Sequence, residues 1–157
     1  MIKNCLSFCL FSLLLLSACQ APPDNSLTAP DQAYFENFLP NIAKAWNAGD
    51  REPYIQGHEH SVYMVPHAQT LSNPTEIRAF VEGFPECTTE YSDLEIMGNQ
   101  ELVAVQGKFL VNQLDGSLLD KGKFVGLFTK SDGGEWQLSH AIWNSDLPLP
   151  AAAESAE

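Results

Sequence analysis

Basic residues are scarce in this sequence. Eight Lys and Arg stand against twenty Asp and Glu, which gives a formal net charge of −12. Proteins that bind nucleic acid or anionic lipid surfaces present basic patches, so this balance argues against both classes of partner. The chain also has no Gly-rich phosphate-binding loop and no internal repeat. Its 157 residues are the length of one domain.

Cysteine is also rare, and three of the four cysteines lie within the first nineteen residues. Cys5 and Cys9 lie in an apolar N-terminal stretch, and Cys19 follows directly after it. Cys87 is then the single cysteine left in the body of the chain, which predicts a domain without an internal disulfide. Two neighbouring glutamates disfavour a thiolate at Cys87, so we interpret that residue as structural.

The N-terminal stretch has the features of a secretory signal over residues 1–18. One Lys precedes an apolar run that is too short for a membrane-spanning helix. Leu16-Ser17-Ala18-Cys19 resembles the lipobox of bacterial lipoproteins, which implies cleavage before Cys19 and acylation of that residue. Two or more acyl chains anchor a protein stably, at about 0.8 kcal/mol per buried CH₂. The resemblance, with Gln20 after the cysteine, implies a lipid anchor in the bacterial outer membrane, facing the periplasm.

The rest of the chain divides into a tether, a domain and a tail. Residues 19–29 are rich in Pro and small polar residues, which is typical of a flexible linker. Residues 30–148 carry the periodic apolar patterns of a folded domain, and residues 149–157 form a tail with few signals of order. We therefore predict a single core within 30–148.

The first half of the domain is predicted to be helical. Thr28 can cap a helix with Pro30 in its first turn, and an apolar stripe continues to Trp46. Pro40 is expected to kink or split this helix. A short second helix is expected around residues 53–55. The run from Asn73 to Glu76 is a third helix start, since it offers an Asn cap, Pro at the first position and Glu two residues later.

The second half predicts strands over residues 88–97, 101–111, 120–130 and 135–143. Gly-containing turns separate them at Gly98-Asn99, Asp115-Gly116 and Asp132-Gly133-Gly134. A further short strand is expected at residues 61–65. Helices followed by an antiparallel meander define an α+β fold.

Three of the four histidines lie within HEHSVYMVPH, residues 58–67. His58 and His60 would share one face of a strand, a spacing that suits metal ligands. His67 would lie about 23 Å from His60 along an extended chain and on the opposite face, and His140 is the other conceivable third ligand. Cupins are excluded because no Glu follows the second His at their spacing. We therefore expect no metal site and no cofactor, with His58 and His60 at an exposed helix-to-strand junction.

A family resemblance rests on several short motifs in order: AWNAGD at 45–50, VYMVP at 62–66, EIRAF at 76–80 and IWNSD at 142–146. Together they resemble the SnoaL-like branch of the nuclear-transport-factor-2-like superfamily, over roughly residues 30–148. The resemblance implies a cone, in which a bent antiparallel sheet packs on about three N-terminal helices around a pocket. It also implies a homodimer formed through the outer face of the sheet. Activities differ widely on this fold, so function must be argued from the site.

Acid–base chemistry has one candidate residue. Ketosteroid isomerases of this fold use an Asp directly before a Pro, whereas Val65 precedes Pro66 here, and residues 124–128 contain no second acid. His140 lies in the last strand and shares a face with Leu138 and Ile142 if the strand alternates regularly. Asp50 resembles a family position, but we interpret it as a helix-end carboxylate. Asn144 and Asp146 are interpreted as groups that fix the strand end.

The predicted pocket is aromatic, which suits a small and mostly apolar ligand. Its candidate lining residues are Trp46, Tyr54, Tyr63, Phe109, Phe124, His140 and Trp143. Two functions remain open. The first is an envelope-anchored lipoprotein that binds such a ligand or a protein partner without catalysis. The second is an isomerase or dehydratase that uses His140 as general acid or base, with help from Tyr54 or Tyr63.

Overall fold

The computed structural model describes residues 24–148, in which helices precede a five-stranded sheet. The helices are α2 (Ala29–Asn47), α3 (Glu52–His58) and α4 (Pro74–Glu82), with the short strand β1 (Val62–Met64) between α3 and α4. Four long strands follow: β2 (Cys87–Gly98), β3 (Leu102–Gln113), β4 (Leu118–Lys130) and β5 (Trp136–Ser145). The predicted α+β class is confirmed.

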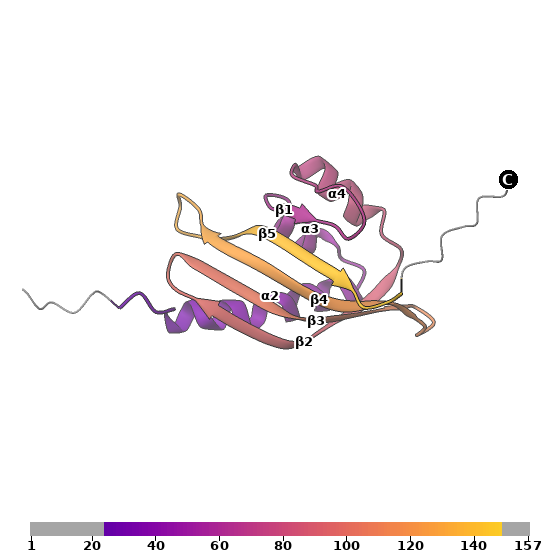
Figure 1. Cartoon of the computed structure of the whole chain (residues 1–157), viewed down its shortest axis with the longest axis horizontal. Helices are drawn as coiled ribbons and strands as arrows, with labels where there is room; N and C mark the ends of the chain where they lie inside the picture. The colour runs from indigo at the N-terminus through magenta and orange to yellow at the C-terminus, as the bar shows by residue number, and fades with distance from the viewer. Residues whose placement is uncertain (1–23, 149–157) are drawn as a thin grey trace, which may run out of the picture.

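The long strands form an antiparallel meander in which each strand pairs with the next. The sheet order is β1-β5-β4-β3-β2, and β1 joins the edge of the sheet parallel to β5. Register shifts interrupt the pairing of β2 with β3, of β3 with β4 and of β4 with β5. Such irregularities bend a strand and increase its twist. In Figure 1, α2 runs along the sheet, whereas α3, α4 and β1 gather beside β5.

Helix α2 begins where the sequence predicts, because the Thr28 side chain accepts a hydrogen bond from the backbone N–H of Asp31. The helix is not split at Pro40, which corrects one of the two expected outcomes. Pro40 lies on the exposed side of α2. The opposite side buries Phe35, Leu39, Ile42 and Trp46 against the sheet, so packing holds both halves of the helix in place.

The core lies between α2 and one face of the sheet. Phe35 is fully buried, and its ring lies 5.1 Å, centroid to centroid, from the rings of both Phe128 and Trp136. Val103 and Val105 of β3 are buried on the same face. This packing fills the α2 side of the fold. The cavity described below lies further along the same face, under α3 and α4.

The last residues of the predicted tether are part of the fold. Ser26 forms a β-bridge with Asn99, Leu27 packs against the core, and the backbone N–H of Gln100 donates to the Asn25 carbonyl oxygen at 3.0 Å. The ordered structure therefore starts before residue 30. Residues 1–23, including the predicted signal and Cys19, lie outside the described residues, as does the tail from residue 149.

Candidate functional site

A cavity of about 130 Å³ lies between the helices and the sheet. Its polar lining side chains are His58, Thr89 and Asp120, and Cys87 contributes a thiol. Nine of its nineteen lining residues are aromatic. They are Trp46, Tyr54, Tyr63, Phe80, Phe84, Tyr91, Phe109, Phe124 and Trp143. The cavity is thus an aromatic chamber with a few polar groups.

Helix α3 brings Tyr54 and His58 together. The two residues are four apart, which places them on one side of a helix. Their rings stack with centroids 4.0 Å apart and planes inclined by 2°. His58 Nδ1 lies 2.8 Å from the Tyr54 carbonyl oxygen. Because a carbonyl oxygen only accepts, Nδ1 carries the hydrogen and Nε2 keeps its lone pair.

Burial determines the charge of His58. The residue is only 7% exposed. Removal from water disfavours the imidazolium and lowers the pKa of His58 to about 4, despite the opposing effect of the bond to Tyr54. His58 is therefore neutral near pH 7. His58 lines the cavity, and its Nε2 lone pair is able to accept a hydrogen bond.

Two tyrosine hydroxyls meet in the same part of the cavity. Tyr54 from α3 and Tyr63 from β1 share a short hydrogen bond between their Oη atoms. Only one of the two can donate in that bond, so the other hydroxyl hydrogen is free for a ligand. Burial raises the pKa of Tyr54, Tyr63 and Tyr91 well above the ordinary value, so all three stay protonated.

Asp120 is the single carboxylate among the described residues that line the cavity. The Ser145 hydroxyl donates to its Oδ1 at 2.6 Å, and the backbone N–H of Lys121 donates to the same oxygen at 2.8 Å. Oδ2 has no hydrogen-bond partner among the described residues. Asp120 is half-buried, so the carboxylate is fixed in place while one oxygen stays available.

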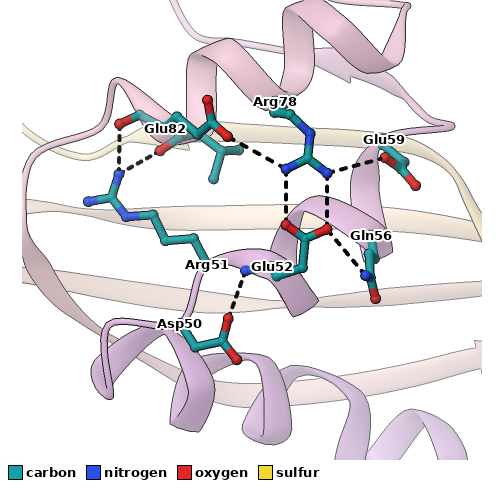
Figure 2. Close-up of polar contacts among 8 residues, drawn as sticks. Asp50, Arg51, Glu52, Gln56, Glu59, Arg78 and Glu82 are labelled. Carbon is teal, nitrogen blue, oxygen red and sulfur yellow. Dashed lines mark hydrogen bonds and ion pairs between the residues drawn. The ribbon is translucent and has the colours of Figure 1, made fainter.

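An ion-pair network on the outer side of α3 fastens α3 to α4 (Figure 2). Arg78 of α4 binds both carboxylate oxygens of Glu52 at 3.0 Å, and it also approaches Glu82 at 3.5 Å and Glu59 at 4.0 Å. These side chains are between 25% and 59% exposed. The network holds α4 in position over the cavity, which α4 lines with Phe80 and Val81.

Arg51 makes a second connection between these helices. Its guanidinium donates to the backbone oxygens of Val81 at 2.7 Å and Glu82 at 3.1 Å, at the end of α4 (Figure 2). It also donates to the backbone oxygen of Pro85 at 3.1 Å. The same group lies 5.0 Å from the ring centre of Trp46. Arg51 thus satisfies carbonyl groups that a helix end leaves unpaired, and it packs on a wall of the cavity.

Six of the seven residues predicted to line the pocket do line it, and His140 does not. A register shift between β4 and β5 pairs Leu127 with His140 and Phe128 with Leu138, so Ser139 is an extra residue. The extra residue breaks the alternation that placed His140 on the same face as Leu138. Leu138 is buried in the core, whereas His140 is exposed. The expectation that His140 lies in the pocket is therefore wrong.

The histidine-rich segment also differs from its prediction. His58 is not at an exposed junction, because α3 continues through it and buries it. His60 is exposed, with its side chain 63% accessible, and His67 lies in the loop after β1. Within residues 24–148, no three His, Cys, Asp or Glu side chains gather in a geometry that could hold a metal ion.

The other polar residues considered from the sequence lie outside the cavity. Asp50 accepts a hydrogen bond from the backbone N–H of Glu52 at 3.1 Å, at the start of α3. Asp146 pairs with Lys123 at 2.6 Å and accepts from Asn144 at 3.1 Å. Cys87, by contrast, lines the cavity as a buried free thiol. No helix in the described part of the chain is long and apolar enough to cross a membrane.

Comparison with known proteins reveals similarity in structure rather than in sequence. No protein-family model and no curated protein matches the sequence. A protein of unknown function with a cystatin-like fold from Nostoc punctiforme PCC 73102 has a TM-score of 0.67 at 16% identity, over 80% of this chain and 98% of that one. An NTF2-like protein with a cystatin-like fold from Novosphingobium aromaticivorans has a TM-score of 0.61 at 14% identity, over 73% and 80%.

An enzyme shares the same architecture. Hexachlorocyclohexane dehydrochlorinase LinA-type3 from Novosphingobium barchaimii LL02 has a TM-score of 0.60 at 14% identity, over 77% of this chain and 90% of that one. At such identities the likeness defines the fold and not the activity. The fold is nuclear-transport-factor-2-like, as the sequence motifs predict.

Proposed function

We propose that this domain binds one small, mostly apolar molecule inside the aromatic chamber and holds a polar group of that molecule at the Tyr54–Tyr63 hydroxyl pair. The observation that carries the proposal is the cavity of about 130 Å³ with a wall of aromatic rings. A dry protein cavity of about 150 Å³ binds benzene, so a chamber of this size suits a single ring. Buried polar groups in such a wall fix the orientation of the ligand.

Binding is favoured over proton-transfer chemistry by the state of the polar groups. His58 has a pKa of about 4, so it accepts hydrogen bonds but is a weak base near neutral pH. The tyrosines keep their protons because burial raises the pKa of each. The alternative enzyme that uses His140 lacks support, since that side chain is exposed and does not border the cavity.

We also propose that the domain is a SnoaL-like lipoprotein anchored at the cell envelope through Cys19. The support is the sequence Leu16-Ser17-Ala18-Cys19 after an apolar run. Metabolic labelling with an alkyne fatty acid tests the anchor. The expected result is label in the full chain and none in Cys19→Ser. Equal label in both would contradict it.

The cavity function is tested by calorimetric titration of the full chain with phenol and with toluene, which differ by one hydroxyl. Both are expected to bind saturably. Phenol is expected to lose about two- to tenfold in affinity in Tyr63→Phe, the worth of one hydrogen bond, while toluene is unchanged. Tyr34→Phe is the matched control because Tyr34 is 40% exposed and lies outside the cavity. Absence of saturable binding by both probes would refute the proposal.

A further inference from the structure

The cavity is lined by one acidic side chain and by no basic one among the described residues. Among the described lining residues none is Lys or Arg, whereas Asp120 offers a carboxylate and His58 offers a lone pair. Nine aromatic rings line the same cavity, and the faces of such rings are electron-rich. Carboxylates and aromatic faces both attract organic cations, and neither favours an anion.

Asp120 adjoins the aromatic part of the wall without an intervening side chain on its own strand. The pairing aligns Tyr91, Phe109 and Gly122 in one row across β2, β3 and β4, and Thr89, Val111 and Asp120 in the next. On β4, Gly122 separates Asp120 from Phe124, and all three positions share the face toward the helices. A side chain at Gly122 would collide with the Asn144 backbone and the Phe109 ring, so none separates Asp120 from Phe124 on β4, and both residues line the cavity.

The carboxylate is arranged to receive one more donor. Both of its recorded hydrogen bonds, from the Ser145 hydroxyl and from the Lys121 N–H, go to Oδ1. Oδ2 is left for a ligand. The ammonium of nearby Lys123 is paired with Asp146 at 2.6 Å. Hence it does not compete for Asp120.

We propose that the ligand of the chamber is a small apolar amine, whose ammonium group donates to Oδ2 of Asp120 while its ring or alkyl body lies among the aromatic side chains. This inference rests on the proposed function and adds the ligand's charge to it. The net charge of −12 works in the same direction, because an acidic protein raises the local concentration of cations.

Calorimetric titration of the full chain with 2-phenylethylamine and 2-phenylethanol tests this inference, with 3-phenylpropanoate as the anionic probe. The amine is expected to bind about tenfold or more tightly than the alcohol at pH 7, since a charge-assisted hydrogen bond is roughly twice as strong as a neutral one. Asp120→Asn should remove the preference. Asp132→Asn removes the same charge from the exposed β4–β5 turn and should leave the preference unchanged.

The outcomes separate the two proposals. Equal affinity for the amine and the alcohol, or tightest binding of the carboxylate, would refute the proposal of a cationic ligand. It would leave the proposal of an apolar ligand in the cavity intact. Saturable binding by none of the three would overturn both. If Asp120→Asn still prefers the amine, the ammonium group does not bind at Asp120, and the role of Asp120 is refuted. If that variant unfolds, the amine–alcohol comparison in the unaltered chain still decides the inference.

Discussion

The two sides of helix α3 use polar side chains in opposite ways. On the inner side, Tyr54 and His58 are neutral, buried and bonded to one another. On the outer side, the partly exposed Glu52 and Glu59 share Arg78 of α4. Only one turn of helix separates the two environments. Burial lowers the pKa of His58 on the inner side, whereas the Arg78 guanidinium lowers the pKa of Glu52 on the outer side.

The two sides of α3 are also expected to contribute differently to the free energy of unfolding. Exposed ion pairs are weak because water screens them and because two long side chains must be ordered. A buried polar group is costly when its partner is lost, since no water replaces that partner. We therefore expect the inner cluster to influence stability more than the outer network, although the outer network contains more charges.

The largest expected effect comes from His58. In the folded chain its pKa is about 4, below the ordinary 6.5, so between these values the unfolded chain takes up a proton and the folded chain does not. The contribution of the neutral His58 to the free energy of unfolding is fully present above pH 6.5. It decreases by about 3 kcal/mol as the pH falls from 6.5 through 4. Urea unfolding of the unaltered chain and of His58→Asn at several pH values measures this slope as the difference between them.

His60→Asn is the control for this pH dependence, because the His60 side chain is 63% exposed. That variant should keep the slope of the unaltered chain. If His58→Asn also keeps it, the neutral buried state of His58 is wrong.

The next largest effect is expected for Tyr63→Phe. This change removes the partner of the Tyr54 hydroxyl in a buried site, which costs about 1–3 kcal/mol of unfolding free energy. Chemical denaturation measures the loss. Tyr34→Phe, at a 40% exposed position, should change stability much less. An equal loss in both variants would contradict the cost assigned to losing the Tyr54–Tyr63 hydrogen bond in the cavity wall.

A smaller effect is expected for Arg51→Gln. The change removes three donors to the end of α4 and the stacking on Trp46, worth about 1–2 kcal/mol together at this half-buried position. Thermal and urea unfolding measure it. Lys44→Gln, an exposed position in the last turn of α2, removes the same charge and should be nearly neutral.

The smallest effect is expected for Arg78→Gln, although it removes contacts to Glu52, Glu59 and Glu82. The unfolding midpoint should fall less than in Arg51→Gln. The difference from the unaltered chain should also shrink as salt rises from about 0.1 M to about 1 M, because the screening length falls from about 10 Å to about 3 Å. A large loss that salt does not reduce would contradict the view of this network as a weak surface feature.

Much of the fold follows from local sequence signals. The cap of α4 is found as predicted, because Asn73 accepts a hydrogen bond from the Glu76 N–H at 2.9 Å. The predicted turns at Asp115-Gly116 and Asp132-Gly134 join the strands, with positive φ at Gly116 and Gly134. These features depend on a few neighbouring residues, and for that reason sequence alone can predict them.

The errors concern features set by tertiary context. The alternation of β5 predicts His140 inside, but a one-residue bulge at Ser139 turns it outward. The sequence places His58 at an exposed helix-to-strand junction, but α3 continues through this residue and buries it. The spacing of four between Tyr54 and His58 is the signal that could have indicated a stacked pair on a helix. Asp120 gave no local signal, because its place in the cavity depends on strand register.

The bridge between Ser26 and Asn99 has a mechanical consequence. Backbone and side-chain bonds from Gln100 hold residues 24–26 against the β2–β3 turn. A pulling force on the chain ahead of Asp24 is borne first by this clamp and only later by α2. Helix α2 supplies Leu39 and Trp46 to the cavity. Tension on the chain ahead of Asp24 therefore reaches this clamp before it reaches the part of α2 that lines the cavity.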